Sequence, residues 1–165
     1  MITHRILLAL MFVAYFSVPS FAELFTGKVV RVLDGDTVDV LHDGKPERVR
    51  LAEIDCPETD QAFGKAAKRY VLDLVAQKVV SVDVTEVGKY GRSIGVVTLQ
   101  GDRNLNRELV RAGYAWWYRK YSDDASIGTL ETEARIARRG LWQDKTPVPP
   151  WEWRKAKRLE ASNGK

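Results

Sequence analysis

The segment Arg50-Leu51-Ala52-Glu53-Ile54-Asp55-Cys56-Pro57-Glu58 has the pattern of a β-strand that ends in a turn. Apolar and β-branched residues come before Asp55, whereas Pro57 cannot donate a hydrogen bond to a strand ladder. Asp and Pro are ordinary turn residues, so this segment on its own fits a plain turn. The same segment places an arginine, an aspartate and a glutamate at and just beyond one strand end. Whether these three residues have a function depends on which residues from the rest of the chain lie near them.

Three strands are predicted in this part of the chain. Apolar residues alternate or cluster over 24–33, 37–42 and 47–54, as is typical of strands with one buried face. The intervening Asp34-Gly35-Asp36 and Asp43-Gly44 favour tight hairpin turns. The three strands are therefore expected to form a meander.

After Glu58 the apolar spacing becomes helical, and it predicts a helix from Phe63 to Val75. Two more strands are predicted over 80–85 and 92–99, joined by a glycine-containing turn. Five strands with a helix between the third and the fourth follow the order of an OB-type barrel. The predicted fold class is therefore mainly β with helices (α+β), built on a five-stranded OB-fold barrel.

Two further helices are predicted beyond the barrel, which gives about three packed helices in total. A short one covers 105–110, with Asn104 or Asn106 as its N-cap, and a longer one runs from about Ala125 to Arg139. Residues 146–165 are rich in Pro, Trp and basic residues, and are expected to leave the domain as a tail that can form a short basic helix.

The first 22 residues have the features of a cleaved secretory signal. Arg5 precedes an apolar run too short for a membrane anchor, and Ser20-Phe21-Ala22 fits a small-x-small cleavage site. We therefore expect export to the periplasm or the extracellular space, with no membrane attachment after cleavage. The rest is expected to be a monomer with one domain, 23–145, and the tail 146–165.

Composition limits the kinds of partner and site. The net charge of +4 is compatible with nucleic acid as a partner, but it is small for a protein that binds by charge alone. The single cysteine, Cys56, excludes an intramolecular disulfide and a cysteine-built zinc or iron–sulfur site.

A barrel would bring several of these charged residues together. Asp36 opens the second strand and Asp55 ends the neighbouring third, so the two carboxylates can meet at one barrel end, where their hard oxygen atoms would suit Ca²⁺. Glu58 would lie within reach of a metal-held water. Arg50 and Arg92 would supply planar forks for phosphate oxygens. Taken singly, each residue fits a plain turn or a solvated surface charge.

The ordered set of motifs resembles the staphylococcal nuclease (thermonuclease) family. The matching segments span nearly all of the chain after the signal: Val32–Val38, Arg50–Glu58, Lys89–Arg92, Leu109–Gly113, Glu133-Ala134 and Gly140–Trp142. The resemblance implies hydrolysis of DNA and RNA with little sequence preference, leaving 3′-phosphate ends. The alternative, from a different functional class, is a catalytically silent OB-fold module that binds nucleic acid.

The resemblance also implies a role for each candidate residue. Asp36, Asp55 and the main-chain carbonyl of Cys56 would bind a catalytic Ca²⁺, and Glu58 would act as general base. Arg50 and Arg92 would bind phosphate and stabilise the transition state. Lys89 and Tyr90 would contact the substrate.

The chain departs from the best-known member of that family at three places. Cys56 replaces a threonine, the segment after Glu58 is much shorter, and Arg119 stands where a tyrosine contacts the ligand. The first change should be tolerated, because a main-chain carbonyl does not depend on the side chain. The shorter segment lacks most of a loop that helps define the substrate groove in that member, so substrate affinity and product length can differ. Because Arg119 replaces the tyrosine, no aromatic contact with the ligand is expected at that position.

Overall fold

A computed structural model describes residues 23–88 and 91–164. Three consecutive strands form the predicted meander: β1 (Glu23–Val32), β2 (Thr37–His42) and β3 (Lys45–Leu51). β5 (Val79–Val87) and β6 (Ser93–Leu99) extend the sheet on the other side of β1, in the order β3-β2-β1-β5-β6. The short β7 (Arg103–Asn104) pairs with the end of β6.

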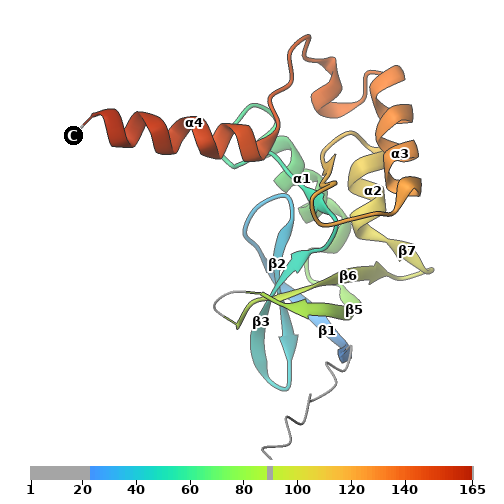
Figure 1. The fold of residues 1–165 in the computed structure, drawn as a ribbon. Coiled ribbons are helices and arrows are strands. Elements are labelled where there is room, and N and C mark those ends of the chain that lie inside the picture. Colours follow the sequence, from blue (N-terminus) through green and yellow to red (C-terminus); the bar gives the residue numbers. More distant parts are fainter. Residues whose placement is uncertain (1–22, 89–90, 165) are drawn as a thin grey trace, which may run out of the picture.

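The barrel closes where β3 pairs with β6 in parallel, with Arg50 opposite Ile94 (Figure 1). Its interior is filled by alternate strand residues whose side chains are fully buried, including Val38, Val40, Val49, Val82 and Val97. This closed five-stranded barrel confirms the predicted OB-like α+β fold.

The third strand is shorter than predicted. Instead of continuing to Ile54, β3 ends at Leu51, and Glu53 adopts a positive φ of 68°. The main-chain N–H of Ala52 donates to the Gly95 carbonyl at 2.8 Å, and the Asn106 side chain donates to the Ala52 carbonyl at 3.0 Å. These bonds fix a bend, after which β4 (Ile54–Asp55) pairs with β8 (Trp116–Trp117) in a second sheet.

Four α-helices lie within the described residues: the three predicted to pack on the barrel, and a fourth where the tail was expected to be able to form a short basic helix. They are α1 (Gly64–Val75), α2 (Leu105–Arg111), α3 (Ala125–Ile136) and α4 (Pro150–Asn163), with a 3₁₀ turn, η2 (Gly140–Gln143), after α3.

The helix ends follow local chemistry. Asn104 is the N-cap of α2, and its side chain accepts a hydrogen bond from the N–H of Arg107. Asn106, the other candidate cap, is buried instead. α3 ends three residues before the predicted Arg139, because Arg138 turns to a positive φ of 49°.

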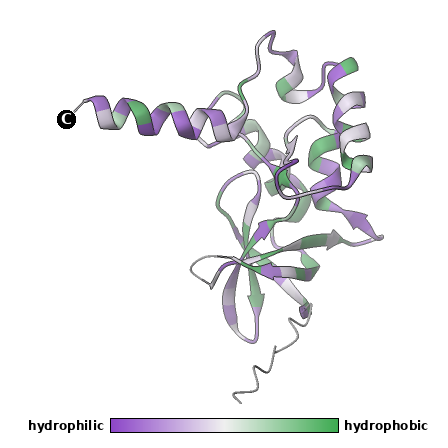
Figure 2. Cartoon of the chain, in the orientation of Figure 1, coloured by the Kyte–Doolittle hydropathy of each residue, from purple (hydrophilic) through white to green (hydrophobic). Residues whose placement is uncertain are grey.

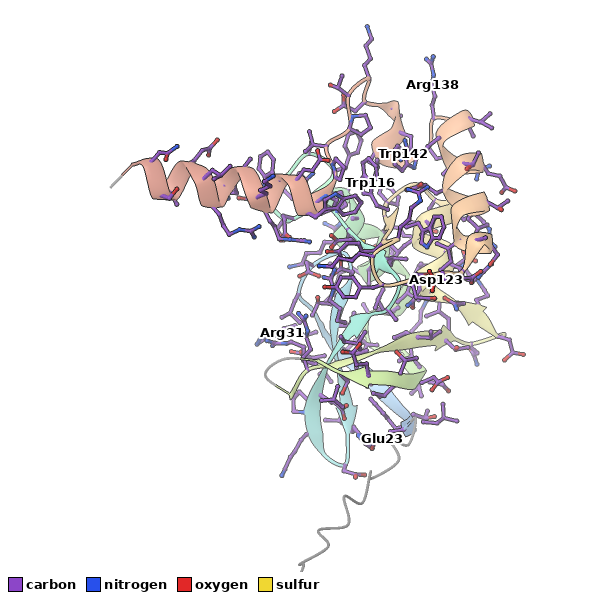
Figure 3. All side chains as sticks on the ribbon, viewed as in Figure 1. Glu23, Arg31, Trp116, Asp123, Arg138 and Trp142 are labelled. Carbon is purple, nitrogen blue, oxygen red and sulfur yellow. The ribbon has the colours of Figure 1, made fainter. Side chains whose placement is uncertain are left out.

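The last helix, α4, is docked at its start by aromatic rings and then projects from the body (Figure 1). The Trp151 ring stacks on Tyr118 with centroids 5.2 Å apart and also meets the edge of Trp116. Trp116 and Trp142, neighbours in Figure 3, complete this cluster with a centroid distance of 4.5 Å. Hydrophilic residues make up most of α4 (Figure 2).

The proposed signal segment, residues 1–22, lies outside the described residues. Within the described part of the chain, no helix combines the length and apolar character needed to cross a membrane.

Candidate active site

Asp36 is held at the end of the barrel by a close approach of two loops. A Cβ on Gly35 would lie 2.7 Å from the Cβ of Cys56 and 2.9 Å from that of Ala67, so only glycine lets the β1–β2 turn come this near. The contact allows the N–H of Cys56 to donate a 2.8 Å hydrogen bond to Oδ2 of Asp36. The two loops thereby form one cradle around this carboxylate.

Arg50 joins the two buried aspartates. Its guanidinium donates through Nη1 to Oδ1 of Asp36 and through Nη2 to Oδ1 of Asp55 at 2.6 Å. Both carboxylates are buried, with Asp36 2% and Asp55 0% exposed. Burial works against the charged form of Arg50, but the two carboxylates outweigh it and raise the pKa of the guanidinium.

The environment of Asp36 disfavours the charged form of its carboxyl group. Burial raises its pKa to about 7, Arg50 opposes that effect, and the like charges of Asp34 and Asp55 reinforce it. A buried carboxylate of this kind gains stability from any additional positive charge nearby. The pair of aspartates is therefore suited to bind a cation.

Glu58 lies just past the aspartates on a tight turn. Its N–H donates to the Gln61 side chain at 3.1 Å, and its carbonyl accepts from the N–H of Gln61 at 2.8 Å. A Cβ on Gly64 would lie 1.8 Å from that carbonyl, so α1 starts directly against the turn. The Glu58 side chain is 36% exposed and borders an open groove along the start of α1, so solvent reaches it.

Arg92 lies next to the pairing of β3 with β6 that closes the barrel. It immediately precedes β6, whose first residue, Ser93, pairs with Val49 beside Arg50. Arg92 is half-buried, and within residues 23–88 and 91–164 its Nε has no hydrogen-bond partner. Lys89 and Tyr90, the predicted substrate contacts, lie outside the described residues.

One further residue at the site was not predicted. Arg154 of α4 donates to Oδ2 of Asp55 at 2.7 Å and to Oε1 of Glu58 at 2.7 Å. The sequence does show a basic helix here, but it does not show which of its charges faces the barrel. The only signal was Trp151, three residues earlier, which anchors the helix.

The donor set at this end of the barrel fits a hard cation. Asp36 and Asp55 would offer carboxylate oxygens, and the carbonyl of Cys56 would add a main-chain oxygen. The Cys56 thiol is buried, which raises its pKa, and it is too soft to be a calcium ligand. Among the described residues no three His, Cys, Asp or Glu side chains form a metal-binding cluster, so a cation here would depend partly on main-chain and water oxygens.

Comparison with known proteins agrees with the fold. The family model described as "Staphylococcal nuclease homologue" matches residues 48–144, which include Arg50, Asp55, Glu58 and Arg92. Asp36 and Arg154 fall outside the matched segment.

Several relatives carry nuclease names, among them the following three. An "Uncharacterized endonuclease" of Escherichia coli O157:H7 is 44% identical over 142 residues, covering 86% of this chain and 93% of the relative. A "Micrococcal nuclease" of Shigella flexneri is 47% identical over 150 residues, 85% and 86% of the two chains. An "Uncharacterized endonuclease" of Haemophilus influenzae is 41% identical over 135 residues, 81% and 75% of the two chains. The chain therefore belongs to the staphylococcal nuclease family.

Proposed function

We propose that the protein is a calcium-dependent nuclease that hydrolyses phosphodiester bonds of both DNA and RNA and leaves 3′-phosphate ends. The observation that carries this proposal is the convergence of Asp36, Asp55, Arg50 and Glu58 at one end of the barrel. A module that only binds nucleic acid would have no use for a solvent-accessible carboxylate next to a buried carboxylate pair. Membership of a nuclease family supports the same conclusion.

In the proposed mechanism each residue of the site has a separate role. Glu58 orients the attacking water and accepts its proton. Arg50 and Arg92 donate to the non-bridging phosphate oxygens, whose negative charge increases in the transition state. Lys89 and Tyr90 would contact the substrate, as the family resemblance implies. A Ca²⁺ ion held by Asp36, Asp55 and the carbonyl of Cys56 would supply Lewis-acid stabilisation of the same charge.

A cleavage assay tests the function directly. The protein without residues 1–22 is incubated with single-stranded DNA and with RNA, in Ca²⁺ and in excess chelator. We expect both polymers to be cut in Ca²⁺ and neither in chelator. Binding without cleavage in Ca²⁺ would support the silent OB-fold module instead, and equal cleavage in chelator would contradict the calcium assignment.

We further propose that the protein is exported and works as a monomer. The support for export is the signal-like sequence of residues 1–22. N-terminal sequencing of the mature protein should give a start near Glu23, in the periplasm or the medium. An intact Met1 end would contradict export, and light scattering of the purified protein tests the monomer.

A further inference from the structure

The three hydrogen bonds of Arg154 connect α4 to the centre of the site. Besides its 2.7 Å bonds to Asp55 and Glu58, Nη1 of Arg154 donates to Oδ1 of Asp55 at 3.2 Å. The fork thus touches both oxygens of a carboxylate that is completely buried, while the arginine side chain itself is 32% exposed. A partly exposed residue ninety-nine positions away in sequence therefore reaches a fully buried carboxylate of the site.

The position of Arg154 is set by contacts other than its own ion pairs. Before it, Gln61 donates to the Val148 carbonyl at 2.6 Å and Trp151 stacks on Tyr118. After it, Lys157 pairs with Asp60 at the turn that leads into α1. These contacts do not involve the guanidinium, so the docking of Trp151 above all keeps Arg154 near the site when its bonds to Asp55 break.

A cation bound by Asp55 would compete with Arg154. Both would take oxygens of the same carboxylate, and two positive groups this close in a buried setting repel each other strongly. The guanidinium would then leave Asp55 but remain next to Glu58. The water activated by Glu58 must attack a phosphorus atom nearby, so a phosphate oxygen of the substrate would come within reach of the freed fork.

We propose that Arg154 is a third functional arginine of the site, which exchanges its bonds to Asp55 for a phosphate oxygen of the nucleic acid. This proposal rests on the nuclease function proposed above. Arginine suits the exchange because its planar fork matches carboxylate and phosphate equally well. On this proposal α4, which lies beyond the segment matched by the family model, is part of the active site.

Two binding measurements test the exchange without relying on turnover. The variants are Arg154→Ala and Arg154→Lys, with Arg158→Ala as the matched control, an exposed arginine one turn further along the same helix. Calorimetry with Ca²⁺ alone should show several-fold tighter binding for Arg154→Ala, because a competing cation is gone. Fluorescence anisotropy with single-stranded DNA in Ca²⁺, in a Glu58→Gln background that prevents cleavage, should show about tenfold weaker binding.

Kinetics and folding controls complete the test. Arg154→Ala should lose about tenfold or more in kcat/KM and regain part of it in millimolar guanidinium, which a purely structural role would not explain. Arg158→Ala should match wild type in both binding assays, and tryptophan fluorescence checks that α4 stays docked. Calcium binding by Arg154→Ala that is unchanged or weaker would overturn the exchange.

Activity and DNA affinity equal to or above wild type in Arg154→Ala would overturn the substrate role and indicate an inhibitory contact. A wild-type protein that does not cleave in Ca²⁺ refutes the nuclease proposal itself, so the two failures are distinguishable.

Discussion

The main-chain N–H of Cys56 donates a 2.8 Å hydrogen bond to a carboxylate oxygen of Asp36. This bond crosses between two loops and orients the Asp36 carboxylate, whose pKa burial raises to about 7. It also places the main chain of Cys56 beside Asp36. The cradle therefore depends on how closely the two loops approach.

Gly35→Ala should separate these loops. The new Cβ would clash with Cys56 and Ala67, so we expect a loss of about 1–3 kcal/mol in the free energy of unfolding and a clear loss of calcium affinity. Gly44→Ala is the control, because its Cβ meets nothing within 4 Å and adds only the cost of a φ of +75°, about 1 kcal/mol. Urea unfolding measures the loss of stability in each variant, and calorimetry measures its calcium affinity. Normal calcium affinity in Gly35→Ala would contradict the proposal that the close approach of the two loops shapes the cation site.

Arg92→Lys and Arg50→Lys should differ in their effect on stability. Both lose a planar fork, and we expect kcat to fall by about 10²-fold or more in each. Only Arg50 bridges two buried carboxylates, so its variant should also lose about 1–3 kcal/mol of unfolding free energy. Steady-state kinetics and thermal unfolding test this difference. A fall in kcat of less than threefold for Arg92→Lys would show that Arg92 does not take part in catalysis.

Trp151→Ala should release α4 from the barrel. The ring stacks on Tyr118 and meets Trp116, and its loss should cost about 2 kcal/mol. The freed helix should become sensitive to trypsin, which cleaves after its Lys and Arg residues. Trp153→Ala is the comparison on the same helix. Equal resistance of wild type and Trp151→Ala to trypsin would show that other contacts hold α4.

His42 should make stability depend on pH. A 2.7 Å hydrogen bond to Glu47 raises the pKa of the imidazole above its ordinary value of 6.5. The protonated form is thus favoured in the folded state, so its stabilisation is complete below pH 6.5 and is lost as the pH rises through the raised pKa. The difference in unfolding free energy between wild type and His42→Asn should shrink over that range. A constant remainder is expected from the stacking of His42 on Phe25, and a difference independent of pH would contradict the assignment.

The spacing of apolar residues was sufficient to predict the parts of the molecule whose structure depends on residues close together in the sequence. The apolar stripe of α1 buries Ala67, Val71 and Val75 as expected, and the turn residues placed Asp36 next to the end of the third strand. The bend at Glu53 was missed, because it depends on Asn106, a buried residue from a distant helix. No local pattern specifies that kind of contact.

Arg154 shows the same limit at the site. The residues that share a motif, Arg50, Asp55 and Glu58, could be grouped from sequence because one strand end carries them. Arg154 reaches them only through the docking of Trp151 on aromatic rings from another part of the chain. A helix of mixed charge gives no indication of which arginine will face inward.

The parallel pairing of β3 with β6 has a consequence for the order of synthesis. β3, which carries Arg50, and β6, which directly follows Arg92, meet only when the barrel closes, and Arg154 joins only after α4 has left the ribosome. A nascent or translocating chain therefore carries the separate parts of a nuclease without an assembled site. For a protein proposed to be exported, this arrangement would protect the nucleic acids of the cell that makes it until folding is complete elsewhere.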